Sequence, residues 1–177
     1  MAETRKYIII TGPESTGKTS LAENISKEYD CVLIPEFARE YVLNLKRKYN
    51  YNDITDIANH QMKQFDEVFG LNSHKPVIFD TFLIITKIWM IWNSGKYESW
   101  LDDVISQTKD AMYLLCYPDI EWVKDNVREN GGGARLKLFQ EYEKELISYN
   151  LNYAIIKGTG ENRINNAKNI VKTYLEK

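Results

Sequence analysis

The segment Tyr7–Ser20 reads YIIITGPESTGKTS and decides the fold of the chain. Its first part, Tyr7–Thr11, is rich in isoleucine and predicts a short buried strand. The next residues, Gly12–Thr19, fit the pattern G-x-x-x-x-G-K-[ST], a loop whose backbone N–H groups fold around phosphate oxygens. A helix is expected to follow over Gly17–Tyr29. This order of strand, loop and helix indicates a binder of nucleoside triphosphates.

Each residue type in this loop has a physical task. Lys18 is placed to reach the β- and γ-phosphates, and the Thr19 hydroxyl can hold magnesium. The helix N-terminus adds the positive end of its dipole. We therefore expect ATP and Mg2+ as cofactors. The residues expected to contact ATP here are Gly12, Glu14, Ser15, Thr16, Gly17, Lys18, Thr19 and Ser20.

Composition is that of a globular protein. The chain has 177 residues, 44% hydrophobic and 27% charged, so we expect a single domain over residues 1–177. A net charge of -2 provides no global field for a phosphate polymer or an anionic membrane, and the longest apolar run, Phe82–Trp92, is too short to span a bilayer. We expect no nucleic-acid or membrane partner and a cytoplasmic location. The 12 tyrosines could cover the core or form a face between copies of the chain, which leaves a homo-oligomer open.

Short apolar runs alternate with longer segments of helical period. This alternation indicates an α/β fold, with helices on the faces of a parallel sheet. The expected strands are Tyr7–Thr11, Val32–Ile34, Val77–Asp80, Met112–Cys116 and Tyr153–Ile156. The expected helices are Gly17–Tyr29, Ile54–Phe69, Phe82–Asn93, Trp100–Thr108, Glu121–Glu129, Leu136–Tyr149 and Arg163–Leu175. Residues 46–52 are expected to form a mobile surface excursion.

Carboxylates follow the second and third expected strands, at the sheet edge where ligands collect in parallel folds. Asp80 could coordinate magnesium or contact an acceptor hydroxyl, and it could also cap the next helix. Glu36 is placed where a general base could take a proton from an attacking hydroxyl. Arg39 would share a helical face with Glu36, so a salt bridge at a helix start is the alternative. We expect Lys18, Glu36 and Asp80 to be catalytic.

Two apolar helices contain further candidates. Gln61 falls at the centre of the apolar stripe of Ile54–Phe69, so its amide needs either buried backbone or a ligand as a partner. His60 projects away from that stripe. Trp89 either belongs to the core or offers an aromatic wall to a flat acceptor ring.

Arginines flank a glycine triplet after the fourth expected strand. Arg128 and Arg135 lie on either side of Gly131–Gly133, which predicts a hinged lid over about residues 122–136 whose cations close on the phosphates. A flexible surface loop would show the same pattern. Farther along, the turn ending at Arg163 is in the right topological place to bind adenine. We expect all three arginines to contact ATP and Arg128 to be catalytic.

These motifs together resemble the ribosylnicotinamide kinase domain of NadR-type NAD biosynthesis proteins over nearly the whole chain. The resemblance rests on Thr11–Ser20 (TGPESTGKTS), Pro35–Val42 (PEFAREYV), His60 with Gln61, Phe79–Thr81 (FDT), Glu121 with Trp122 and a following Arg128, and the helix after Arg163. It implies a P-loop kinase fold with sheet order 2-3-1-4-5. It also implies transfer of the γ-phosphate of ATP to the 5′-hydroxyl of nicotinamide riboside.

The resemblance further implies where the nucleoside and the metal bind. Glu36 and Asp80 would contact ribose and metal, and which of the two acts as the base is left open. The residues expected to contact the nucleoside are Glu36, Arg39, Tyr41, His60, Gln61, Asp80, Thr81 and Trp89, and those expected to hold the metal are Thr19 and Asp80. Bifunctional members have an adenylyltransferase domain upstream, and we expect no room for one here, so that this chain would not complete NAD.

Two other functions stay open. The nearer one is a kinase of another nucleoside or deoxynucleoside with a similar fold. The other is a switch or regulatory module that binds ATP or GTP and signals through a partner. Against the switch, the sequence contains no Asn-Lys-x-Asp motif of the guanine-binding type.

Overall fold

A parallel β-sheet forms the centre of the protein, as the computed structural model shows for residues 5–70, 74–124 and 129–177. Its strands in the described residues are β1 (Tyr7–Thr11), β2 (Val32–Ile34), β3 (Val77–Asp80), β4 (Met112–Cys116) and β5 (Asn152–Ile156). Their order is β2-β3-β1-β4-β5, and every pairing is parallel. The expected α/β class and the expected strand order are confirmed.

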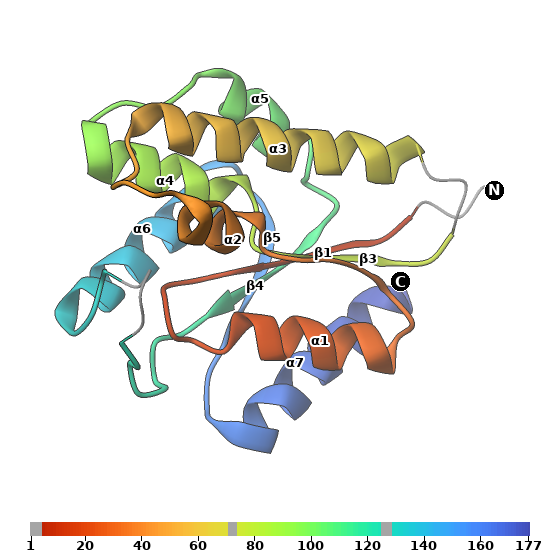
Figure 1. Ribbon diagram of the computed structural model, residues 1–177. Helices are drawn as coiled ribbons and strands as arrows, with labels where there is room; N and C mark the ends of the chain where they lie inside the picture. Colours follow the sequence, from red (N-terminus) through yellow and green to blue (C-terminus); the bar gives the residue numbers. More distant parts are fainter. Residues whose placement is uncertain (1–4, 71–73, 125–128) are drawn as a thin grey trace.

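Helices cover both faces of this sheet (Figure 1). The helices of the described residues are α1 (Lys18–Glu28), α2 (Phe37–Asn44), α3 (Tyr51–Gly70), α4 (Leu83–Ser94), α5 (Trp100–Ser106), α6 (Gly133–Ser148) and α7 (Gly160–Leu175). α1 and α7 lie on one face, and α3 to α6 lie on the other (Figure 1). No helix in these described ranges has both the length and the apolar character needed to cross a membrane.

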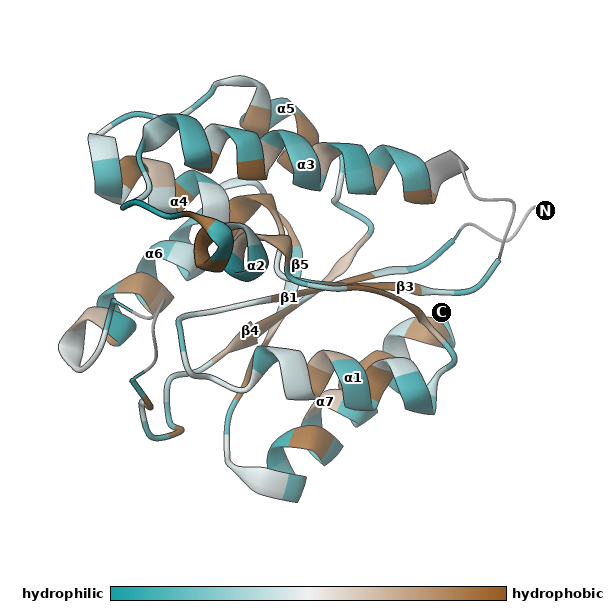
Figure 2. Cartoon of the chain, viewed as in Figure 1, coloured by the Kyte–Doolittle hydropathy of each residue, from teal (hydrophilic) through white to brown (hydrophobic). Residues whose placement is uncertain are grey.

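Two apolar cores result from the alternation of side chains along β1. Ile8 and Ile10 are fully buried in the core beneath α1 and α7, whereas Ile9 is fully buried in the larger core beneath α3 to α6. Figure 2 shows the consequence, because the strands are brown while the outer helix surfaces are largely teal. A strand buried on both sides has no polar face, which explains its uninterrupted apolar sequence.

The segment before α3, which was expected to be a mobile surface excursion, is held by several hydrogen bonds. Arg47 forms two hydrogen bonds of 2.7 and 2.8 Å with the Asp53 carboxylate, and the N–H of Asn50 donates to the same carboxylate at 2.7 Å. The Asn50 side chain in turn accepts the N–H of Asn52 at 2.9 Å. These hydrogen bonds from Arg47 and Asn50 lower the pKa of Asp53 to about 2. Such reciprocal capping lets α3 begin at Tyr51, three residues earlier than expected.

A buried cation joins three helices on the larger core. Lys87 of α4 donates to Glu145 of α6 at 2.6 Å and to Tyr149 at 2.7 Å, and it lies 3.1 Å from Asp102 of α5. Tyr149 also donates to Asp102. Burial opposes the charge on Lys87, but its hydrogen bonds to these partners raise its pKa above the ordinary value. The cation is therefore retained in the folded protein and holds α4, α5 and α6 together.

The turn after β1 passes very close to β4. A Cβ added at Gly12 would lie 2.7 Å from the carbonyl oxygen of Cys116 and 3.0 Å from its Cβ. Gly12 also has a φ of 137°, a backbone conformation that L side chains rarely adopt. Both facts require glycine at this position.

Replacing this glycine tests how strongly the close approach constrains the fold. Gly12→Ala should lower the free energy of unfolding by about 2–5 kcal/mol, because it adds a backbone clash to an unfavourable φ. Urea denaturation followed by circular dichroism measures the loss. Gly133→Ala is the matched control, since a Cβ there meets nothing within 4 Å, and it should change stability by less than about 1 kcal/mol. Equal stabilities of the two variants would contradict the constraint.

Candidate active site

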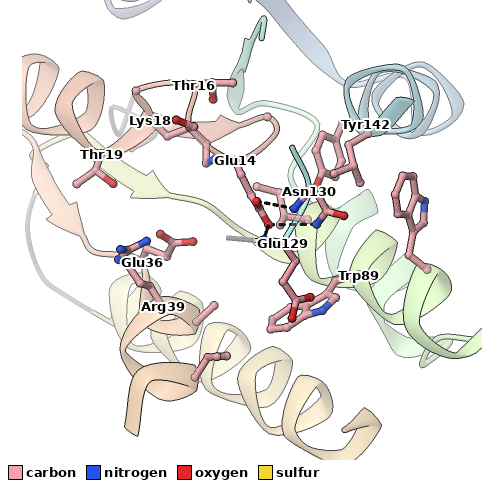
Figure 3. A pocket seen from close by; sticks show the side chains of 18 of the residues that line it. Glu14, Thr16, Lys18, Thr19, Glu36, Arg39, Trp89, Glu129, Asn130 and Tyr142 are labelled. Atoms are coloured by element: carbon pink, nitrogen blue, oxygen red, sulfur yellow. Dashed lines mark hydrogen bonds between the residues drawn. The ribbon is translucent and has the colours of Figure 1, made fainter. Parts of the chain in front are cut away.

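A cavity of about 510 Å³ opens at the carboxyl edge of the sheet. Figure 3 shows its walls, which come from the loop after β1, from α2, from α4 and from α6. The lining residues are Gly12, Glu14, Ser15, Thr16, Gly17, Lys18, Thr19, Ser20, Glu36, Ala38, Arg39, Val42, Tyr49, Ile85, Trp89, Trp92, Glu129, Asn130, Leu138 and Tyr142. All eight residues of the loop pattern that were expected to contact ATP are among them.

The phosphate-binding loop has the backbone shape that its glycines allow. Gly17 has a φ of 74° and directly precedes α1, so the first N–H groups of that helix face the loop. The Thr16 hydroxyl donates to the carbonyl of Pro13 at 2.9 Å, and the Lys18 amine donates to the same oxygen at 2.7 Å. The Lys18 side chain therefore lies along the loop, and its amine is held beside the loop backbone, where it could also contact a bound anion.

Segments from the second half of the chain are hydrogen-bonded to this loop. The Glu14 carboxylate accepts the N–H of Asn130 at 3.0 Å and its side-chain amide at 3.1 Å (Figure 3). The Ser15 hydroxyl donates to the carbonyl of Glu121 at 3.2 Å and accepts the N–H of Val123 at 3.1 Å. The expected helix over Glu121–Glu129 is therefore wrong for residues 121–124 and 129, which form no helix. Their backbone is used by the loop instead.

Arg135 is placed differently from the expected lid cation. It is buried, with 6% of its surface exposed, and does not line the cavity. Its Nε donates to the carbonyl of Glu14 at 3.1 Å, its Nη1 to Ile120 at 2.8 Å and its Nη2 to Ser15 at 3.0 Å. The guanidinium thus lies behind the phosphate-binding loop. Arg128 lies outside the described residues, as does part of the expected lid over about residues 122–136.

Arg163 has a comparable position behind another turn. Its guanidinium donates to Asp119 at 2.7 Å, to the carbonyl of Gly158 at 2.9 Å and to that of Tyr117 at 3.0 Å. Asp119 also accepts the N–H of Gly158 at 2.6 Å. Arg163 therefore fixes the shape of the turn after β5 and, like Arg135, is not a lining residue of the cavity.

Asp80 and Thr19 form a pair that fits magnesium. Asp80 is 2% exposed, and Thr19 donates a hydrogen bond to its carboxylate. Its Oδ1 is buried without a hydrogen-bond partner in the described part of the chain, so one oxygen is available to a cation. Burial raises the pKa of Asp80, against the hydrogen bond from Thr19 and the charge of Lys18. The alternative of a helix cap does not hold, because α4 begins after Phe82.

The opposite wall of the cavity contains charged and aromatic side chains. Arg39 of α2 and Glu36, the residue just before this helix, enter it on one side, and Trp89 enters it from α4 (Figure 3). The ring of Tyr49 meets that of Trp89 edge-on, with centroids 4.9 Å apart, and the Tyr49 hydroxyl donates to Glu129 at 2.6 Å. Sequence reasoning missed Tyr49, because nothing in its local pattern reveals a contact with residues 40 and 80 positions away.

Besides Asp80, four residues expected to bind the acceptor do not line this cavity. The buried Gln61 accepts a 2.6 Å hydrogen bond from the Thr86 hydroxyl, a partner between α3 and α4 that neither expected alternative included. Tyr41 donates to the carboxylates of Asp53 and Asp56 on α3. His60 stacks on the ring of Phe37 at 3.5 Å. The fourth, Thr81, is buried at the end of β3. These contacts join α2 and α4 to α3, and thereby position the wall formed by Glu36 and Trp89.

Fold and site define a P-loop protein, and comparison with known families agrees. A family model described as an AAA domain matches residues 7–163. Because the match covers most of the chain, the chain belongs to this family.

Individual relatives are consistent with the resemblance drawn from the motifs. The chain is 23% identical over 150 residues to the trifunctional NAD biosynthesis/regulator proteins NadR of Salmonella typhimurium and Escherichia coli, covering 82% of this chain. It spans 36% of the length of these relatives. A solved structure of a NadR protein in complex with NR has a TM-score of 0.77 at 18% identity, covering 96% of this chain and 50% of that one. Deoxyadenosine kinase from M. mycoides has a TM-score of 0.64 at 16% identity, with 94% and 99% covered. These structures share the fold.

The environment of Asp80 predicts a cost to stability that depends on pH. Since the pKa of Asp80 is raised in the folded state, its ionised form opposes folding above the ordinary value of 3.8, and this cost grows as the pH rises toward the raised value. Asp80→Asn should therefore increase the free energy of unfolding near pH 7 by about 0.5–2 kcal/mol. The gain should shrink below the ordinary pKa. Urea denaturation across this range measures it, and a gain confined to acidic pH would contradict the burial effect.

Proposed function

We propose that the chain is an ATP-dependent kinase that transfers the γ-phosphate to the 5′-hydroxyl of nicotinamide riboside, giving nicotinamide mononucleotide. One observation carries this proposal: the phosphate-binding loop and the wall with Glu36 and Trp89 line the same cavity. A donor triphosphate on the loop and a nucleoside against the wall would meet within it. Proximity of this kind supplies a large part of the rate in phosphoryl transfer.

The donor side would neutralise the charge of the transferring group. Lys18 is close enough to the loop to exchange its bond with Pro13 for one with a phosphate oxygen. The N–H groups of the loop and of the first turn of α1 add fixed positive dipoles. Thr19 and Asp80 would hold Mg2+, which neutralises charge on the β- and γ-phosphate oxygens when bound.

Glu36 is the carboxylate we assign as general base. It lines the cavity, whereas Asp80 is buried, is bonded to Thr19 and is not a lining residue. A Glu36 oxygen would take the proton of the 5′-hydroxyl as the new P–O bond forms and the bond between the γ-phosphorus and the bridging oxygen of ADP breaks. Asp80 would then serve to hold Mg2+ and would not act as the base.

The chemistry of the wall supports nicotinamide riboside as the acceptor. Its ring is a flat pyridinium cation, and the cavity offers Trp89 together with the carboxylates Glu36 and Glu129. The resemblance to NadR proteins, one of which has been solved in complex with NR, favours the same acceptor. The likeness to deoxyadenosine kinase makes other nucleosides the alternative to be tested.

The direct test is ADP release from ATP and Mg2+ with nicotinamide riboside, uridine, cytidine, adenosine or deoxynucleosides, with the product mass confirmed. Nicotinamide riboside should stimulate release and yield the mononucleotide. Lys18→Met should lower kcat by about a hundredfold or more while leaving the unfolding transition in place. Stimulation by another nucleoside would identify that nucleoside as the acceptor in place of nicotinamide riboside. Slow hydrolysis without stimulation by any of them would favour a nucleotide switch.

A second prediction separates a stacking role of Trp89 from a role in the core. If its ring faces the pyridinium, Trp89→Leu should raise KM for nicotinamide riboside about five- to thirtyfold and change KM for ATP less than about twofold. Steady-state kinetics with each substrate varied in turn measures both values. An equal rise in the two KM values would instead indicate that Trp89 only supports the fold of α4.

A further inference from the structure

We propose that Arg135 is a positioning residue for the β-phosphate of the donor, acting through the backbone of the phosphate-binding loop rather than by touching the nucleotide. This inference rests on the proposed nucleotide site. It differs from the role expected of an arginine in a lid, which would close on the phosphates themselves. The structure places the Arg135 guanidinium behind the loop, buried and outside the lining of the cavity.

Arg135 binds two loop carbonyls, and the peptide units that contain them also contain N–H groups that could bind a phosphate. The peptide unit that contains the Glu14 carbonyl also contains the N–H of Ser15, and the unit with the Ser15 carbonyl contains the N–H of Thr16. In a trans peptide the N–H and the C=O point in opposite directions. By holding these carbonyls at 3.1 and 3.0 Å, Arg135 turns both N–H groups away from itself. Ser15 and Thr16 both line the cavity, so the N–H groups are presented on its side.

This arrangement needs an external support because Ser15 is strained. Its φ is 55°, in the left-handed region that costs a residue with a side chain about 1 kcal/mol or more. The hydroxyl of Ser15 is bonded to Glu121 and Val123, and its carbonyl is bonded to Arg135. Together these hydrogen bonds stabilise a backbone conformation of Ser15 that would be unfavourable without them.

An arginine suits this position better than a lysine. Its planar guanidinium donates in several fixed directions, so one side chain meets the carbonyls of Glu14, Ser15 and Ile120 at once. It also adds a full positive charge behind the two peptide dipoles, which polarises their N–H groups toward an anion. A lysine would retain the charge but lose most of the geometry.

A role through these N–H groups makes a specific prediction about ligands. Loop N–H groups of this type cradle the α- and β-phosphates, whereas the γ-phosphate is met by the loop lysine and metal. Loss of Arg135 should therefore weaken the binding of ADP and of an ATP analogue by the same factor. Direct contact of a lid arginine with the γ-phosphate would instead weaken only the triphosphate.

The experiment is titration calorimetry of ADP and AMP-PNP, each with Mg2+, on the full chain and on Arg135→Met and Arg135→Lys. Arg135→Met should raise Kd for both nucleotides by equal factors of about ten or more, since two hydrogen bonds to a charged group are lost. Arg135→Lys should show a smaller but still equal rise. KM for the nucleoside acceptor should stay within about twofold of the wild-type value.

Tyr149→Phe is the matched control for a general loss of stability. It removes a hydroxyl bonded to Lys87 at the far end of α6 and leaves the phosphate-binding loop untouched. It should lower the unfolding midpoint without changing Kd for ADP.

The outcomes separate this proposal from the one on which it rests. Unchanged ADP binding by a folded Arg135→Met variant, or weakening of AMP-PNP alone, would overturn the positioning role while the nucleotide site stands. A Tyr149→Phe variant that loses ADP affinity as strongly as Arg135→Met would also overturn it. If the wild-type chain binds neither nucleotide, the proposed function fails first, and this inference fails with it.

Discussion

The parallel pairing of β1 between β3 and β4 is the constraint on which the rest of the structure depends. Because parallel strands end at the same edge, it brings the loop after β1 and the carboxylate of Asp80 at the end of β3 to one place. It also forces the turn at Gly12 against the backbone of Cys116, which leaves no room for a side chain. Sheet pairing thus determines both the position of the site and the glycine that begins its phosphate-binding loop.

The phosphate-binding loop is a joint product of two distant parts of the chain. Its own residues supply the glycines, Lys18 and Thr19, but the loop is also hydrogen-bonded to residues more than a hundred positions later in the chain. Arg135 and Arg163 illustrate the same solution at two turns on the carboxyl edge of the sheet, where a buried guanidinium satisfies several carbonyls at once. At both turns the positive charge therefore serves to shape the backbone.

The sequence was sufficient for the strands and for the phosphate-binding loop, because both are written in local patterns: uninterrupted apolar runs such as Ile8–Ile10 and a fixed spacing of glycines and lysine. Prediction from the sequence failed where a contact between distant residues determines the local structure. The helical pattern of residues 121–124 is overridden by bonds to Ser15, and the amide of Gln61 finds the Thr86 hydroxyl on a neighbouring helix. The direction of the Arg135 guanidinium has no local signal at all, since two of its partners, Glu14 and Ser15, lie 121 and 120 positions earlier in the chain.

The ion pair between the buried Lys87 and the partly buried Glu145 also couples the movements of two helices. It joins α4, which carries Trp89, to α6, which carries Arg135 near its start. Separating the pair would leave the buried Lys87 charge without this partner, which is costly, so a shift of α4 tends to take α6 with it. The aromatic wall on one side of the cavity and the support of the phosphate-binding loop on the other are therefore parts of one frame. Displacing this aromatic wall would therefore also disturb the side chain that supports the phosphate-binding loop.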